Sequence, residues 1–135
     1  MITAIDTNIL LDILLPNERL YGSSAAALED SATTGALVIC DMVYGELCIH
    51  FETQRDCDTF LESNDIHVQP LNRRACFLAS RAWRTYRRQG GKRNRILPDF
   101  LIAAHASEQA HRLLSRDRGF YRELFPALKL YDPTE

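Results

Sequence analysis

The chain has 135 residues, of which 46% are hydrophobic and 25% are charged, and its formal net charge is −2 at pH 7. This length and composition fit one domain, residues 1–135, with a substantial core, and they exclude a disordered or fibrous protein. No segment is typical of a signal peptide or a transmembrane helix, so we expect a cytoplasmic protein with no membrane partner. The four cysteines form no CxxC pair, which favours free thiols.

The small net charge hides an uneven distribution of charged residues. Residues 1–65 contain twelve acidic and two basic residues, whereas residues 66–98 contain nine basic residues and no acidic one. This asymmetry is typical of an acidic pocket beside a basic surface that faces a polyanion. A solvated helix face gives the same charge pattern, so the pattern alone does not establish nucleic-acid binding.

Strand-like and helix-like segments alternate along the whole chain. We expect, in order, a strand at Ile2–Asp6, helices at Asn8–Leu15 and Leu20–Thr33, a strand at Leu37–Cys40, and helices at Met42–Phe51 and Thr53–Ser63. There follow a strand at Ile66–Gln69, helices at Asn72–Gln89 and Asp99–Gln109, a strand at Arg112–Ser115, a helical turn at Phe120–Leu124 and a strand at Leu128–Tyr131. Asp41 and Thr53 are expected to cap the helices that follow them. The alternation predicts an α/β fold, a three-layer α/β/α sandwich around a mostly parallel central sheet.

Four acidic residues lie close to the ends of expected strands or at the start of a helix: Asp6, Glu46, Asp99 and Asp117. Residues beyond the strand ends of a parallel sheet gather at one edge, where ligands bind. Carboxylates brought together there repel one another, and oxygen ligands favour a hard divalent cation such as Mg²⁺ or Mn²⁺. Each acid also has an ordinary explanation, such as helix capping for Asp6 or a favourable helix dipole for Asp99.

Several neighbouring polar and aromatic residues complete the candidate site. Thr7, Asn8 and Ser115 could orient the carboxylates by hydrogen bonding. His105 is flanked by apolar residues, and we interpret it as a packed core histidine rather than a metal ligand. The helical spacing of Trp83 and Tyr86 favours core packing over stacking against nucleobases.

These residues carry a resemblance to PIN-domain ribonucleases, and among them to the VapC-type toxins of prokaryotic toxin–antitoxin pairs. The matching segments are AIDTN at residues 4–8, YGEL at 44–47, PDFLIAAHA at 98–106 and LSRDRGF at 114–120. The resemblance spans nearly the whole chain and implies a PIN-like fold in which Asp6, Glu46, Asp99 and Asp117 hold Mg²⁺ or Mn²⁺. Asp12 and Asp41 are additional acids near this set, and either could assist it.

The resemblance further implies hydrolysis of RNA phosphodiesters to 5′-phosphate and 3′-hydroxyl ends, a homodimer, and a small VapB-type antitoxin as partner. Basic residues near the site would attract the RNA backbone: Arg84, Arg87, Arg88, Lys92, Arg93 and Arg95. One alternative is a catalytically silent PIN-like module that binds nucleic acid. Another is a metal-dependent phosphatase, although the chain has no glycine-rich loop to hold a phosphate.

Overall fold

The structure is a computed structural model that describes residues 1–15, 17–91 and 97–134. Three of the expected RNA-binding residues, Lys92, Arg93 and Arg95, lie outside these described residues. No helix in the described part is long and apolar enough to cross a membrane. The cysteines are free, as the sequence predicted.

A sheet of five parallel strands forms the centre of the molecule, with the order β3-β2-β1-β4-β5. The strands are β1 (Thr3–Ile5), β2 (Leu37–Ile39), β3 (Ile66–Val68), β4 (Arg112–Leu114) and β5 (Leu130–Tyr131). The chain adds β2 and β3 on one side of β1 and then β4 and β5 on the other. The direction of strand order therefore reverses at β1, and the crevice beyond the carboxyl ends of β1 and β4 is where such sheets bind ligands.

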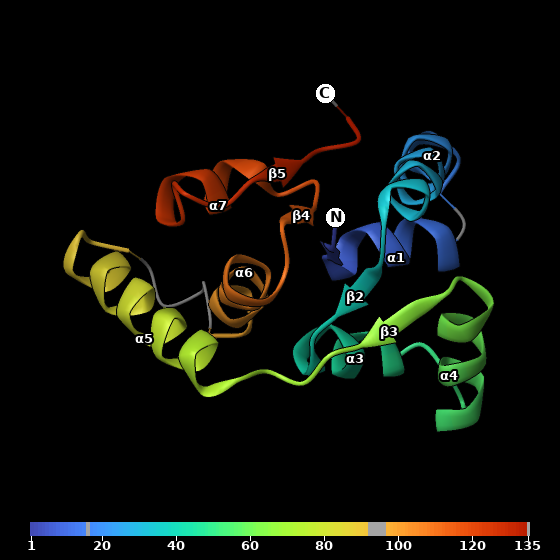
Figure 1. Cartoon of the computed structure of the whole chain (residues 1–135), viewed down its shortest axis with the longest axis horizontal. Coiled ribbons are helices and arrows are strands. Elements are labelled where there is room, and N and C mark those ends of the chain that lie inside the picture. The colour runs from blue at the N-terminus through green and yellow to red at the C-terminus, as the bar shows by residue number, and fades with distance from the viewer. Residues whose placement is uncertain (16, 92–96, 135) are drawn as a thin grey trace.

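Helices connect the strands and cover both faces of the sheet, which confirms the predicted α/β sandwich. They are α1 (Thr7–Leu14), α2 (Glu18–Thr34), α3 (Asp41–Cys48), α4 (Gln54–Ser63), α5 (Arg73–Arg88), α6 (Leu97–Gln109) and α7 (Arg118–Leu124). Figure 1 shows α5 and α6 on one side of the sheet and α1 and α2 on the other. Right-handed crossovers between parallel strands require this two-sided arrangement.

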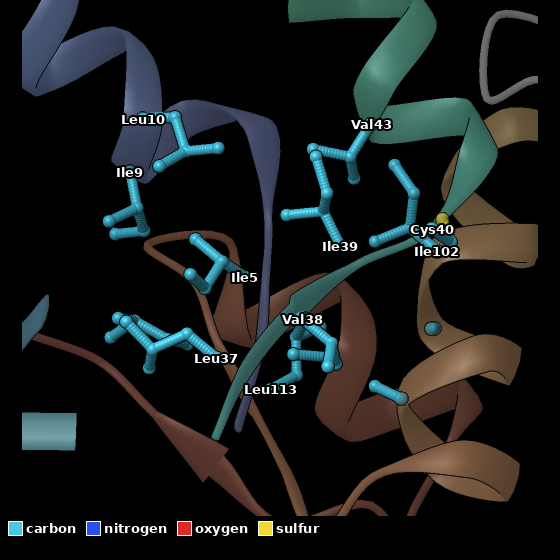
Figure 2. Packing of buried hydrophobic residues seen from close by; sticks show 14 of the residues in the cluster. Ile5, Ile9, Leu10, Leu37, Val38, Ile39, Cys40, Val43, Ile102 and Leu113 are labelled. Atoms are coloured by element: carbon cyan, nitrogen blue, oxygen red, sulfur yellow. The ribbon is translucent and has the colours of Figure 1, made fainter. Parts of the chain in front are cut away.

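Aliphatic side chains from the strands meet those of the helices in one continuous core (Figure 2). Ile5 and Ile39 of the central strands are buried, as are Ile9 of α1 and Ile102 of α6. Burying each such side chain contributes about 1.5–3 kcal/mol relative to leaving it in water. The central strands β1 and β2 are thus buried on both faces, and the residues that follow them take defined positions at the sheet edge.

Capping residues set the start of several helices. Thr53 accepts a hydrogen bond from the backbone N–H of Asp56 and begins α4, as predicted. The predicted cap at Asp41 is wrong, because Cys40 is the N-cap residue and Asp41 is already helical. The carboxylate of Asp41 instead accepts a hydrogen bond from the backbone N–H of Leu71. An acid in the first helical turn is still favoured by the helix dipole.

Two of the three predictions about packed aromatic and imidazole side chains hold. His105 is buried, its Nε2 lies 2.7 Å from Oε1 of Gln69, and burial lowers its pKa to about 4. Tyr86 packs against Phe100 with ring centroids 5.5 Å apart. The prediction for Trp83 is wrong, since 37% of this residue is exposed. The Trp83 ring lies beside the guanidinium of Arg87 on α5. An indole ring tolerates water on one of its faces.

Candidate active site

Asp6 lies at the switch point of the sheet, immediately after β1. It is the N-cap residue of α1, and its Oδ1 accepts the backbone N–H of Thr7 at 2.8 Å. Its Oδ2 accepts the hydroxyls of Ser115 at 2.8 Å and Tyr121 at 3.0 Å, with Nδ2 of Asn8 at 3.4 Å. The capping role weighed for Asp6 is therefore real, but the carboxylate also receives donors from two distant segments.

Burial disfavours the charged form of the Asp6 side chain. Only 6% of the residue is exposed, and this burial raises its pKa from 3.8 to about 6. Hydrogen bonds from Ser115, Tyr121 and Thr7 oppose the rise, while the negative charge of Asp99 adds to it. Asp99 is half-buried in the first turn of α6. Two acids that lie far apart in the sequence therefore interact at this edge.

Glu46 joins the site through Thr7. The Thr7 hydroxyl donates to Oε1 of Glu46 at 2.7 Å, while the Thr7 backbone N–H binds Asp6. One threonine thus links the first residue after β1 with the middle of α3. Glu52, the next acid along the chain, is exposed beyond the end of α3.

The segment after β4 supplies the remaining predicted residues. Ser115 is fully buried, and its Oγ accepts the backbone N–H of Asp117 at 2.9 Å while its hydroxyl binds Asp6. Asp117 is the N-cap residue of α7. The negative charges of Asp6, Asp99 and Asp117 all help to raise the pKa of Tyr121, after burial as the main cause. These three acids therefore all interact electrostatically with one tyrosine hydroxyl, and Asp6 also accepts its hydrogen bond.

Tyr121 is a site residue that the sequence reading missed. It is 1% exposed and lies one helical turn after Asp117, whose backbone oxygen accepts the Tyr121 N–H. A tyrosine four residues past an acid at a strand end was the available signal. Tyrosine also packs readily in cores, so sequence alone did not distinguish the two roles.

Asp12 and Asp41, the two additional acids, have other partners. Asp12 is buried and receives two hydrogen bonds from the guanidinium of Arg116, at 2.7 and 2.9 Å, and one from the hydroxyl of Ser24. Arg116 also donates its backbone N–H to Oδ1 of Asn8 at 3.3 Å. Asp12 therefore fixes the segment between β4 and α7. Asp41 is exposed and bonded to the Leu71 backbone.

The described basic candidates lie on α5. Arg84 and Arg88 are exposed, and Arg87 donates to the backbone oxygen of Gly91 at 2.8 Å. Helix α5 packs along α6, whose first turn carries Asp99 (Figure 1). The basic face and the acidic site therefore belong to adjacent helices.

The donor chemistry of the site fits a hard divalent cation. All four acids offer oxygen ligands, and the raised pKa of Asp6 reflects negative charge held in a buried position. Within residues 1–15, 17–91 and 97–134, no three His, Cys, Asp or Glu side chains are grouped closely enough to hold a metal ion as they stand. A cation held jointly by these acids would therefore need some of their side chains to rotate.

A five-stranded parallel sheet whose strand order reverses beside Asp6 defines an α/β protein with a polar site at its strand ends. The family model described as PIN domain matches residues 3–123, and the chain belongs to this family. No curated protein sequence matches it.

Solved structures share the fold over nearly the full length. A chain of VapBC2 from Rickettsia felis, bound to a DNA fragment from their promoter, is 24% identical, with 98% of each chain covered and a TM-score of 0.74. A chain of VapBC-1 from nontypeable Haemophilus influenzae is 20% identical, with 100% of each covered and a TM-score of 0.73. A toxin–antitoxin complex from Klebsiella pneumoniae gives 17%, 97% of each and 0.70.

Proposed function

We propose that this PIN-domain protein is an Mg²⁺- or Mn²⁺-dependent endoribonuclease and the toxin of a VapBC-type pair, acting in the cytoplasm. The observation that carries the proposal is the shared environment of Asp6, Asp99 and Asp117 around Tyr121, with Glu46 tied to the same edge through Thr7. Family membership and the fold shared with solved VapBC complexes support it.

The four acids Asp6, Glu46, Asp99 and Asp117 are the proposed cation ligands. A divalent cation held by these residues would lower the pKa of a bound water and would neutralise charge on the scissile phosphate. Asp6 and Asp99 are the first choices for direct contact, and Glu46 and Asp117 bind directly or through water and help to accept the proton. Ser115 and Asn8 orient Asp6 by donating hydrogen bonds to its Oδ2.

RNA is the proposed substrate because basic residues lie near the acidic site. Their positive charge would allow the negatively charged RNA backbone to approach the acids. Arg84, Arg87 and Arg88 on α5 offer that charge beside the helix that carries Asp99. Arginine suits phosphate contacts because its donors form a planar fork. Lys92, Arg93 and Arg95 extend the same basic run toward Asp99 in the sequence.

The decisive test is cleavage of a labelled single-stranded RNA with Mg²⁺ or Mn²⁺. Asp6→Asn and Asp99→Asn should each lower the cleavage rate by at least about a hundredfold, since each removes a charged ligand while keeping the shape of the side chain. Asp65→Asn is the matched control, because the Asp65 side chain is 92% exposed and lies at the amino end of β3, whereas Asp6 follows the carboxyl end of the parallel strand β1.

The possible results separate the proposal from its alternatives. Cleavage that both substitutions leave unchanged would falsify the assigned site. Tight RNA binding without cleavage in any divalent cation would indicate a silent binding module. Rapid hydrolysis of a small chromogenic phosphoester, with the RNA intact, would indicate a phosphatase.

The proposed partners are a second copy of this chain and a small VapB-type antitoxin. A basic antitoxin side chain reaching the carboxylates would inhibit by direct charge pairing. Expression of the chain alone, and together with any short open reading frame that precedes its gene, tests this point. We expect growth arrest without the partner and co-purification with it, and arrest should disappear in Asp99→Asn. Harmless expression of an active enzyme alone would refute the toxin assignment.

A further inference from the structure

The two oxygens of Asp6 have different surroundings. Among the residues that the structure describes, Oδ2 receives three donors, from Ser115, Tyr121 and Asn8, whereas Oδ1 receives one, from the backbone of Thr7. A carboxylate oxygen has about two lone-pair sites, so Oδ2 is saturated and Oδ1 keeps capacity for another partner. Rotation of the carboxylate would break the hydrogen bonds on Oδ2.

Tyr121 reaches Asp6 from a rigid position. It is 1% exposed in α7, and its ring contacts that of Phe120 with centroids 5.3 Å apart. Its backbone oxygen accepts the N–H of Phe125 at 2.8 Å, so both its side chain and its main chain are held. A buried phenol needs a hydrogen-bond partner, and Asp6 accepts from it at 3.0 Å.

Thr7 places the available oxygen of Asp6 near Glu46. The Thr7 backbone N–H binds Oδ1 of Asp6, and the hydroxyl of the same residue binds Oε1 of Glu46. The oxygen with remaining capacity therefore lies on the side where a second proposed ligand is already positioned.

We propose that Tyr121 is a positioning residue that, together with Ser115, holds Oδ2 of Asp6 so that Oδ1 is the oxygen available to the divalent cation. This inference rests on the proposed function. In this role Tyr121 acts through Asp6 and does not contact the substrate. Hydrogen-bond partners of metal ligands typically change metal affinity by about 10–100-fold when they are removed.

The test measures Mn²⁺ affinity without RNA, from the electron paramagnetic resonance signal of free Mn²⁺ during titration. Tyr121→Phe removes only the hydroxyl and should weaken Mn²⁺ binding about tenfold, and Ser115→Ala should act in the same direction. Tyr44→Phe is the matched control, because the Tyr44 hydroxyl donates to Asp58 at 2.6 Å in a second tyrosine–aspartate pair outside the site. Its Mn²⁺ affinity should equal that of the unmodified protein.

A second readout separates positioning from general loss of structure. In Tyr121→Phe the Mg²⁺ concentration for half-maximal RNA cleavage should rise about tenfold, while the rate at saturating Mg²⁺ recovers to within about threefold. Unchanged Mn²⁺ affinity in folded Tyr121→Phe overturns the inference alone. If that variant fails to fold, unchanged affinity in Ser115→Ala overturns it. Absence of Mn²⁺ binding by the unmodified protein overturns the proposed function and this inference together.

Discussion

The ion pair between Asp12 and Arg116 gives a quantitative prediction about stability. The Asp12 side chain is 4% exposed and receives two hydrogen bonds from the guanidinium, whose own side chain is 28% exposed. Arg116→Ala leaves a buried carboxylate with only the Ser24 hydroxyl as a side-chain donor among the described residues. Removing one partner of a buried pair typically costs about 3–5 kcal/mol, and partial exposure of Arg116 places this case near 3 kcal/mol.

That loss corresponds to a large change in unfolding temperature. Unfolding entropy of about 2.1 cal/mol/K per residue converts 3 kcal/mol into a decrease of about 10 °C in Tm for a domain of this size. Urea unfolding at pH 7, followed by circular dichroism, measures the same free energy independently. Arg74→Ala is the control, because its ion pair with Glu108 spans 3.8 Å and the Arg74 side chain is 85% exposed. It should change stability by less than about 0.5 kcal/mol.

The double variant Asp12→Leu/Arg116→Met identifies the source of the loss. If the cost comes from stranding a charge, replacing both partners should restore most of the stability that Arg116→Ala loses. Two results would refute this reasoning. One is a loss below about 1 kcal/mol in Arg116→Ala, and the other is a double variant no more stable than the single one.

Three further changes are expected to have defined outcomes. Asp6→Asn should raise the urea midpoint at pH 7 without divalent ions, because burial raises the Asp6 pKa to about 6 and so makes the charged carboxylate destabilising. This destabilisation develops as the pH rises from 3.8 to 6, so at pH 4 the substitution should give no gain in stability. His105 should keep the ¹⁵N chemical shifts of a neutral imidazole down to about pH 5, because burial lowers its pKa to about 4. The stability that the buried neutral ring contributes is lost as the pH falls from 6.5 through 4. The NMR signal of a protonated ring at about pH 5.5 would contradict its burial. Gly35→Ala should destabilise by about 1–3 kcal/mol in thermal unfolding, because its Cβ would clash with the backbone oxygen of Met1, whereas Gly22→Ala in α2 should stabilise by about 0.5–1 kcal/mol. Similar effects at both glycines would refute the clash.

The order of strands and helices was predictable from sequence because the signals are local. Each strand is a short apolar run, and each lies within one or two residues of its predicted position. Thr53 shows the same locality, since its cap involves a residue three positions away. The fold class followed from the alternation of these elements.

Predictions failed or stayed open where distant partners decide the outcome. The role of Asp12 depends on Arg116, 104 residues away, and that of Tyr121 on Asp6, 115 residues away. Trp83 has the spacing of a core residue, but the neighbouring helix α6 does not cover it. Periodicity describes which face of a helix is apolar and does not say how much of that face its neighbours bury.

The separation in sequence between Asp6 and its partners has a consequence for synthesis of the protein. Ser115 and Tyr121, which both bind Oδ2 of Asp6, are translated more than a hundred residues after it. Strand β4, which pairs with β1 at the switch point, is made equally late. A nascent chain on the ribosome therefore cannot assemble this carboxylate environment until α7 has left the exit tunnel, so the organised site arises only after most of the domain has been synthesised.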